Sequence, residues 1–396
     1  MPRCAGPTLA AVVAVGVSVW LSAPAARAEE TGVEQKGAWT HQLTYTVDVT
    51  GAVEGGVQKA GRVLDNIDAV LDGDLGQAFG WRDTKLHIYL LNNSGGRPNE
   101  VVGSLQGVDN IEVARPRLRL YEAWMEHSFG QVSVLAGLYN LNSEFYTTET
   151  SGLLMAPPFG IGSELASTGP NGPSIFPLSS LAVRVKAGAE KGFYGEAAVL
   201  NAHAGTLGAN DDTQMGLDRG VILIGEGGWR GARRLAVGVW GYSEAQDDIR
   251  DTRPDGSPAR HRSQGAYVLA EGPLWSTSRG MGVNAFMRAG VSDGDTSPYE
   301  GGWQAGVKLD KLVPGRPDSA LSIGFQQAFL SRKQRSNGLD QGLAIGPNES
   351  GVEMVYADRI GRVSFRPDLQ LIQNPQGDRN RPTALVGALR LIIDLN

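Results

Sequence analysis

The sequence predicts an all-β fold, a transmembrane antiparallel β-barrel of sixteen strands with short periplasmic turns and long extracellular loops. Apolar and polar residues alternate with a period of two along nearly all of the chain after residue 28. The connections between these segments alternate between short and long. After residue 28 no stretch approaches the roughly 18 apolar residues of a membrane helix, and only a closed barrel satisfies every backbone group in lipid without helices.

The first 28 residues are typical of a secretory signal peptide. Arg3 supplies a positive charge, Leu9 to Leu21 forms an apolar run, and Ala26-Arg27-Ala28 is an A-x-A cleavage site. We therefore expect a signal peptide over residues 1–28 and one barrel domain over residues 29–396, exported through the Sec pathway to the bacterial outer membrane. The single cysteine, Cys4, lies within the signal, so no disulfide is expected in the mature chain.

Sixteen segments show the alternation of a half-buried strand. In the segment from Gly282 to Ser292, for example, Val283, Met287 and Val291 share one face, and Asn284 and Arg288 share the other. The segments begin near residues 41, 62, 84, 117, 131, 180, 192, 219, 233, 265, 280, 302, 319, 351, 362 and 384. The even number fits a single-chain bacterial barrel whose two ends lie on one side.

The connections predict which end of the barrel carries the loops. Long polar stretches are expected over residues 51–61, 93–116, 142–179, 201–218, 243–264, 292–301, 331–350 and 374–382, and links of a few residues alternate with them. The stretch 142–179 is the longest, and it could fold inward to narrow the pore. Six tryptophans near strand ends fit aromatic girdles at the membrane interfaces: Trp39, Trp81, Trp229, Trp240, Trp275 and Trp303.

Charged residues on one face of the strands predict the lining of the pore. A charge that faces the hydrocarbon midplane costs ~2 to 4 kcal/mol, so Arg184, Lys186, Arg288 and Arg366 should point into the lumen, with Glu196 on the same face. Such groups could simply keep a wide lumen hydrated. Alternatively, they could form a constriction in which donors and acceptors, with aromatic rings nearby, bind sugar hydroxyls weakly enough for release.

The strand motifs resemble those of the carbohydrate-selective porin (OprB-like) family. The resemblance rests on Arg119 to Glu126, Ala136 to Phe145, Phe176 to Arg184, Arg366 to Pro375 and Ala384 to Leu391, which occur in the family's order. It implies a sixteen-stranded porin for passive diffusion of glucose and related small sugars, with arginine and glutamate at its narrowest point. Glu122, Glu126, Glu144 and Arg184 lie within the matching motifs, whereas Arg366 stands where the family commonly has a neutral residue.

Composition limits the partners and cofactors. Removing residues 1–28 takes away two of the 36 basic residues and none of the 42 acidic ones, so the net charge changes from −6 to about −8, which gives no support to nucleic-acid binding. The expected partners are small sugars, outer-membrane lipid and the barrel-assembly machinery. No cofactor is expected, and the sequence leaves monomer and trimer open.

Three other functions compete with a sugar porin: a general diffusion porin, a non-transporting structural barrel, and a carbohydrate-acting hydrolase in the outer membrane or secreted. No G-x-S-x-G motif accompanies the five histidines, and His127 and Ser128 would point to opposite faces of a strand, so catalysis is not expected. The motifs Asp72-Gly73-Asp74 and Asp293-Gly294-Asp295 lack the full spacing of a calcium loop and are interpreted as solvated turns.

Overall fold

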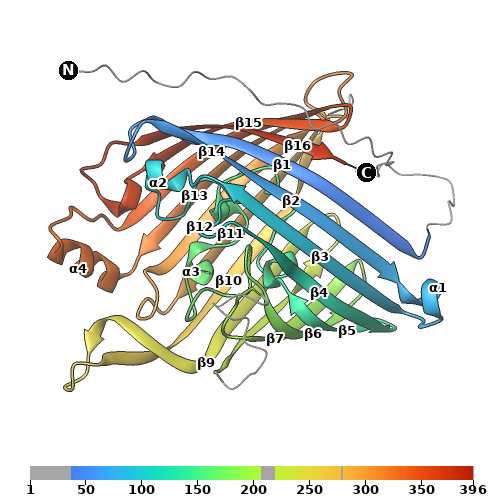
Figure 1. The fold of residues 1–396 in the computed structure, drawn as a ribbon, viewed down its shortest axis with the longest axis horizontal. Coiled ribbons are helices and arrows are strands. Elements are labelled where there is room, and N and C mark those ends of the chain that lie inside the picture. Colours follow the sequence, from blue (N-terminus) through green and yellow to red (C-terminus); the bar gives the residue numbers. More distant parts are fainter. Residues whose placement is uncertain (1–36, 207–218, 278–279, 396) are drawn as a thin grey trace, which may run out of the picture.

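The chain folds into a closed barrel of sixteen antiparallel strands. A computed structural model describes residues 37–206, 219–277 and 280–395. Each strand pairs with its neighbours in the sequence, and β1 pairs with β16 to close the barrel, with Val47 opposite Leu391 (Figure 1). The predicted fold class and strand number are confirmed. The expected signal peptide, residues 1–28, lies outside the described residues and stays a prediction.

The strands begin within a few residues of their predicted positions, with one exception at β10. They are β1 (Trp39–Glu54), β2 (Ala60–Asp74), β3 (Thr84–Gly95), β4 (Arg117–Phe129), β5 (Val132–Tyr139), β6 (Ser180–Gly188), β7 (Gly192–Asn201), β8 (Val221–Arg230), β9 (Arg234–Thr252), β10 (Pro258–Ser276), β11 (Gly282–Ser292), β12 (Tyr299–Asp310), β13 (Ala320–Leu330), β14 (Asn348–Ile360), β15 (Val363–Gln373) and β16 (Ala384–Asp394). The connections contain the short helices α1 (Leu75–Phe79), α2 (Asn99–Val102), α3 (Ser163–Ala166), α4 (Arg332–Asp340), η1 (Leu141–Ser143), η2 (Pro157–Phe159) and η3 (Pro375–Gly377). None of the helices within the described residues is long and apolar enough to cross a membrane.

The two ends of the barrel differ in the length of their connections. At one end, which we call the turn end, β1 begins, β16 ends and the links are short, such as residues 130–131 and 361–362. Both of these links use a glycine with positive φ, Gly130 at 66° and Gly361 at 61°, as tight hairpin turns require. The opposite end, the loop end, carries residues 96–116, 140–179 and 331–347.

Three connections at the loop end are shorter than the sequence predicted. Residues 243–264 were expected to be a long loop, but β9 and β10 continue as a paired ribbon that leaves only residues 253–257 as its tip (Figure 1). Likewise, residues 55–59 alone connect β1 to β2, and residues 293–298 alone connect β11 to β12. The parts of β9 and β10 that extend beyond the membrane-facing region are polar, as loops are. Composition alone therefore could not distinguish these strand ends from a loop.

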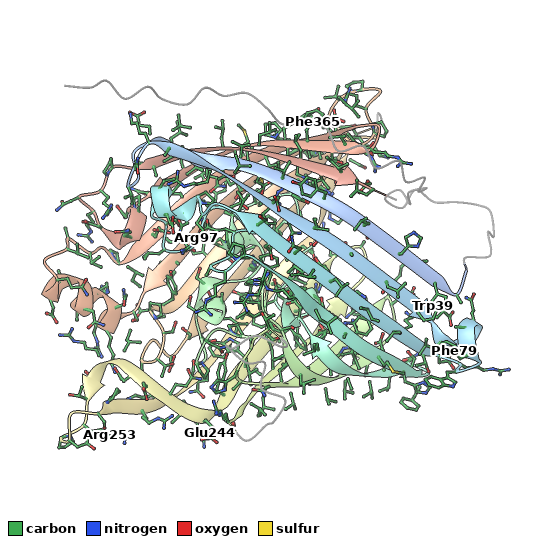
Figure 2. The ribbon with its side chains drawn as sticks, viewed as in Figure 1. Trp39, Phe79, Arg97, Glu244, Arg253 and Phe365 are labelled. Carbon is green, nitrogen blue, oxygen red and sulfur yellow. The ribbon has the colours of Figure 1, made fainter. Side chains whose placement is uncertain are left out.

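The outer face of the barrel is apolar and the inner face is polar. On β9, Val237 and Val239 are exposed on the outside, while the intervening residues point inward. Around the turn end, Trp39 and Trp81 each pack against Phe79 in an aromatic girdle (Figure 2). Trp240 was also expected in a girdle, but its side chain is 4% exposed and lies inside the barrel, because its position on β9 is inward.

Strand β4 contains a bulge, which its sequence indicates because Leu118 and Leu120 share parity with Glu122 and Glu126. Opposite β4, Tyr89 of β3 pairs with Glu122 and the next residue, Leu90, pairs with Leu120, so Tyr121 is an extra residue. The bulge changes the phase of the strand, so that Arg119 before it and Glu122 after it both face the interior.

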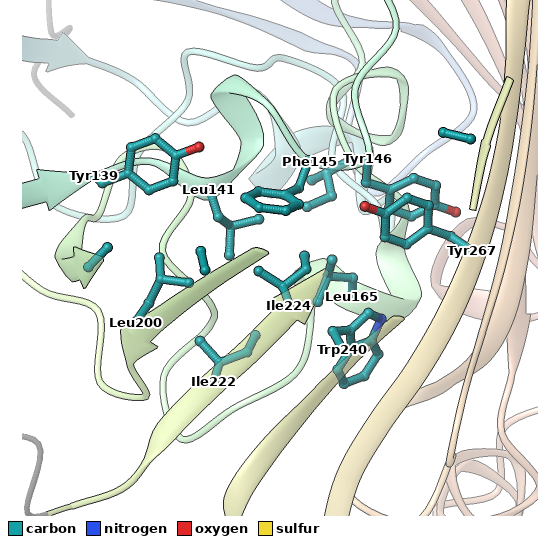
Figure 3. Packing of buried hydrophobic residues seen from close by; sticks show 14 of the residues in the cluster. Tyr139, Leu141, Phe145, Tyr146, Leu165, Leu200, Ile222, Ile224, Trp240 and Tyr267 are labelled. Atoms are coloured by element: carbon teal, nitrogen blue, oxygen red, sulfur yellow. The ribbon is translucent and has the colours of Figure 1, made fainter. Parts of the chain in front are cut away.

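The long loop 140–179 folds into the barrel and fills one side of it, so the inward folding considered from the sequence is observed. Its apolar side chains Leu141, Phe145 and Leu165 pack against the inner faces of β7, β8 and β9 (Figure 3). The contacting strand residues include Leu200, Ile222, Ile224 and Trp240. The packed side chains therefore fill the lumen along part of β7, β8 and β9.

Candidate functional site: the charged belt at the inward loop

The inward loop is fastened to the barrel wall by polar bonds from many strands. Glu226 of β8 accepts the backbone N–H of Tyr146 at 3.2 Å, and Glu271 of β10 accepts both the N–H and the hydroxyl of Thr150 at 2.9 Å. Across the barrel, Glu353 of β14 accepts the N–H groups of Met155 and Ala156. Charged acceptors make stronger hydrogen bonds than neutral ones, so these contacts hold the loop across the lumen.

Arg288 is one of these anchors and does not line the pore. Its guanidinium donates to the carbonyl oxygens of Tyr146 at 2.9 Å, Gly160 at 2.8 Å and Pro158, and to the side chain of Gln304 at 2.9 Å. The residue is completely buried. The prediction that Arg288 faces the interior is correct, but its assignment as a pore-lining residue is wrong, since the loop covers it.

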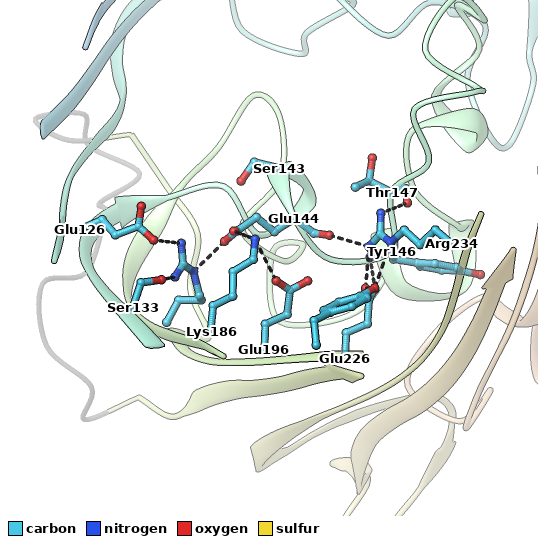
Figure 4. Close-up of polar contacts among 12 residues, drawn as sticks. Glu126, Ser133, Ser143, Glu144, Tyr146, Thr147, Lys186, Glu196, Glu226 and Arg234 are labelled. Atoms are coloured by element: carbon cyan, nitrogen blue, oxygen red, sulfur yellow. Dashed lines mark hydrogen bonds and ion pairs between the residues drawn. The ribbon is translucent and has the colours of Figure 1, made fainter. Parts of the chain in front are cut away.

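Five of the eight predicted site residues form one cluster, which we call the charged belt: Glu126, Glu144, Arg184, Lys186 and Glu196 (Figure 4). Glu144 of the loop accepts from Arg184 Nε and from Lys186 Nζ, both at 2.7 Å. Arg184 also donates to Glu126 at 2.9 Å, and Lys186 lies 3.4 Å from Glu196. The belt therefore joins β4, β6 and β7 to the base of the inward loop.

The pKa of Glu144 lies below its usual value. Burial alone would raise this pKa, but the positive charges of Lys186 and Arg184 and the hydrogen bonds from Lys186 and Tyr139 lower it by more. The Tyr139 hydroxyl donates to the Glu144 carboxylate at 2.6 Å. Glu144 is therefore an anion at neutral pH and keeps the two cations of β6 in place.

The belt continues into a second group that the sequence analysis missed. Arg234 of β9 donates to Glu226 at 2.6 Å and to the carbonyl oxygen of Thr147 at 3.1 Å (Figure 4). Glu226 also accepts from the hydroxyls of Tyr194 and Tyr267. The period-two pattern of β8 could have predicted that Glu226 points inward, because Glu226 shares its face with Ile222 and Ile224, which point inward.

Two cavities lie on opposite sides of the inward loop. The turn-side cavity, about 690 Å³, is lined by Ser143 and Glu144 of the loop and by Lys186, Glu196 and Arg234 of the wall, among others. The loop-side cavity, about 550 Å³, is lined by Asn142 of the loop and by residues that include Asn66, Asp68, Tyr89, Phe176 and Arg390. Since Asn142 lines one cavity and Ser143 and Glu144 line the other, the base of the loop separates the two.

The loop over residues 96–116 also folds inward, which the sequence did not predict. The Glu349 carboxylate accepts the Ser104 hydroxyl at 2.7 Å and the backbone N–H groups of Leu105 and Gln106. Gln106 then accepts from Ser163 of the first inward loop at 3.0 Å. The two loops thus support one another, and both narrow the lumen at the loop end.

The remaining two predicted residues lie outside the charged belt. Glu122 faces the lumen beside the loop base, where it accepts the N–H of Asn140 at 3.3 Å. Arg366 lies on β15 opposite Arg390, whose guanidinium makes a bidentate pair with Asp48 at 2.6 and 2.9 Å. Arg366 is therefore part of a separate charged group near the closure of β1 on β16.

Histidines and paired acids have structural partners. Nδ1 of His127 lies 2.8 Å from the Thr84 hydroxyl, and Asp74 caps helix α1 by accepting the N–H of Gln77 at 3.1 Å. Asp295 pairs with Lys333 at 2.9 Å. Across the ranges 37–206, 219–277 and 280–395, no group of three or more acidic, histidine or cysteine side chains is arranged to hold a metal ion.

Comparison with known proteins relates the barrel to porins. The chain is similar to an OprB of Pseudomonas putida in a high-pH structure, with a TM-score of 0.81 at 18% identity, covering 90% of this chain and 94% of the other. It is also similar to the outer-membrane channel DcaP of Acinetobacter baumannii, with a TM-score of 0.55 at 11% identity and coverage of 91% and 99%. No curated protein matches the chain in sequence. The family model for the carbohydrate-selective porin, OprB family, matches residues 58–395, and the chain therefore belongs to that family.

Proposed function

We propose that the protein is a passive outer-membrane channel for small neutral sugars such as glucose, with the charged belt as its selective constriction. Membership of the carbohydrate-selective porin family supports a sugar porin. The observation that carries the choice of site is the position of Glu144, which lines the turn-side cavity and binds both Arg184 and Lys186 at the base of the loop that separates the two cavities.

The charge pattern of the belt favours neutral polar solutes over ions. Its two cations and three carboxylates are paired with one another over 2.7 to 3.4 Å, so their fields largely cancel. A sugar hydroxyl both donates and accepts, so it can bond to either kind of group, whereas an ion of either sign meets like charges as well as opposite ones. The individual bonds stay weak enough for release, as conduction requires.

The orientation follows from the two ends of the barrel. Bacterial outer-membrane barrels have short periplasmic turns and longer outer loops. We therefore infer that the loop end faces the medium and that a sugar meets the loop-side cavity first, then the charged belt, then the turn-side cavity. Export through the Sec pathway is part of the same proposal and rests on residues 1–28.

Uptake into proteoliposomes tests this function. The purified protein should admit labelled glucose faster than a diamine of similar size, and Lys186→Ala should reduce the preference, because it leaves the belt with an excess of negative charge that attracts the cation. Lys308→Ala, which removes a cation from the turn-side cavity outside the belt, serves as the matched control. Equal uptake of both solutes would indicate a general diffusion porin, and hydrolysis of a glycoside by the folded protein would favour the enzyme.

A further inference from the structure

Five aromatic side chains form a continuous series on the inner wall. Trp124 stacks on His87 with ring centroids 4.7 Å apart, and His87 is followed by Tyr89 at 6.3 Å. Tyr121 lies 5.2 Å from Tyr89, and Phe176 of the inward loop lies 6.2 Å from Tyr121. The series therefore runs along β3 and β4 and reaches the loop.

The Tyr89 ring is held in place by its polar edge. Its hydroxyl donates to the carboxylate of Asp68 on β2, and Asn66 donates to the same carboxylate oxygen at 2.7 Å. These bonds fix the ring against the wall, where it lines the loop-side cavity. A fixed ring loses little conformational entropy when a ligand stacks on it.

The two rings nearer the turn end are held in the same way. Nδ1 of His87 lies 2.7 Å from the Asp72 carboxylate, and the indole N–H of Trp124 donates to Glu122 at 3.2 Å. Tyr89, His87 and Trp124 are thus each tied to a carboxylate, whose other lone pairs could accept sugar hydroxyls. This repeated arrangement is not needed for barrel closure, which depends on backbone pairing.

The series opens into the loop-side cavity. Tyr89 and Phe176 line that cavity together with Asn66 and Asp68. Tyr121 is 3% exposed and supports the two neighbouring rings from behind. The cavity thus combines aromatic surface with hydroxyl-binding groups, which is the combination that a pyranose requires, since it has apolar C–H faces and a polar rim.

We propose that the series Phe176–Tyr89–His87–Trp124 is a stacking track for pyranose sugars, and that saccharides of two or more rings bind it more tightly than a monosaccharide. The proposal rests on the proposed function and deepens it by naming the substrate class. His87 lies 4.7 Å from Trp124 and 6.3 Å from Tyr89, and Tyr121 joins Tyr89 to Phe176 over 5.2 and 6.2 Å, so a saccharide can reach the next ring before it leaves the previous one. A longer saccharide covers more rings at once.

Block of single-channel current tests the track. Glucose and its α-1,4-linked disaccharide and trisaccharide are added in turn, and the dissociation constant of each is determined from the block. For the unaltered protein we expect the constant to fall about three- to tenfold with each added ring, which corresponds to the energy of one aromatic contact. Tyr89→Leu should remove most of this gain.

A matched control separates stacking from general effects of losing a tyrosine. Tyr356 lies on the outer face, where its hydroxyl donates to Asp358 at 2.8 Å as that of Tyr89 does to Asp68. Tyr356→Leu should leave the gain per sugar ring unaltered. Should Tyr89→Leu fail to fold, Phe176→Leu tests the other exposed ring of the cavity.

The outcomes distinguish the track from the proposed function. Equal dissociation constants for all three saccharides, with glucose still blocking the current, would overturn the track and leave a sugar porin. A gain per ring that survives both Tyr89→Leu and Phe176→Leu would overturn it as well. If no saccharide blocks the current, the proposed function itself is wrong.

Discussion

The Nε of Arg184 on β6 donates to the carboxylate of Glu144 on the inward loop over 2.7 Å. This bond joins the rigid wall to the loop that crosses the lumen, at the base of the loop that separates the two cavities. A side chain held by both the wall and the loop has few alternative positions, so the constriction is set in advance of any solute. The loop and the charged belt therefore act as one unit.

The pKa of Glu144 predicts how this unit responds to acid. Since the pKa is lowered below its usual value of 4.5, the ion pairs with Arg184 and Lys186 persist as the pH falls through 4.5 and are lost only as it falls through the lower pKa of the folded protein. We expect the contribution of Glu144 to conductance and ion selectivity to be constant down to about pH 4.5 and to change below it. Glu144→Gln should abolish that acid transition. A transition between pH 5 and 7 that depends on Glu144 would contradict the assignment.

Arg288 should matter for stability and for the size of the pore. Arg288→Met leaves three loop carbonyl oxygens without their donor, which should destabilise the folded protein by about 3 kcal/mol. Unfolding in detergent measures the loss, and a larger single-channel conductance should accompany it as the loop loosens. Lys308→Met, which removes a half-exposed cation from the adjoining strand, is the control and should change stability by much less. Unaltered stability of Arg288→Met would show that the loop does not depend on this anchor.

The assignment of strand faces can be tested on β11. Met287 is exposed on the outer face, whereas Asn284 lines the turn-side cavity. Met287→Arg places a charge against lipid and should cost about 2 to 4 kcal/mol, while Asn284→Arg keeps its charge in water and should cost far less. Reversible unfolding in lipid vesicles compares the two. Equal losses would mean that the outer face of this strand does not meet hydrocarbon.

Glu349 should hold the second inward loop. Glu349→Gln weakens charge-assisted bonds to Ser104, Leu105 and Gln106, so we expect a loss of about 1 to 2 kcal/mol in local stability. Hydrogen exchange at the amides of Leu105 and Gln106 should become faster. Glu100→Gln changes an exposed residue of the same loop, paired only with Arg97 over 2.9 Å, and should leave these amides protected. Equal exchange in both variants would refute the anchoring role.

The strands could be predicted from the sequence because their signal is local. The alternation in β11 places Arg288 inside and Met287 outside by pattern alone, and the structure agrees. The phase change in β4 likewise indicated a bulge, which is found at Tyr121. Within the charged belt, Arg184 and Lys186 were found because two basic residues share the inner face of one short strand.

The positions of the loops could not be predicted because they depend on contacts between distant parts of the chain. Nothing near Arg288 in the sequence shows that the carbonyl oxygens of Tyr146 and Gly160 will cover it. In the same way, Glu349 binds the backbone N–H of Leu105. Because every residue except proline has a backbone N–H, the sequence does not indicate which of these groups Glu349 will bind. The alternation thus predicts which side chains enter the lumen, whereas the loops decide which of them a solute can reach.

The most direct test of a sugar-selective channel is the single-channel current of the purified protein in a planar bilayer, with glucose added against a fixed salt background. We expect discrete steps that glucose reduces in a saturable manner, while an equal concentration of an unrelated osmolyte does not, and Arg184→Ala should weaken the block. Current steps that glucose does not reduce would indicate a general diffusion porin. The absence of any conductance from demonstrably folded protein would contradict the account.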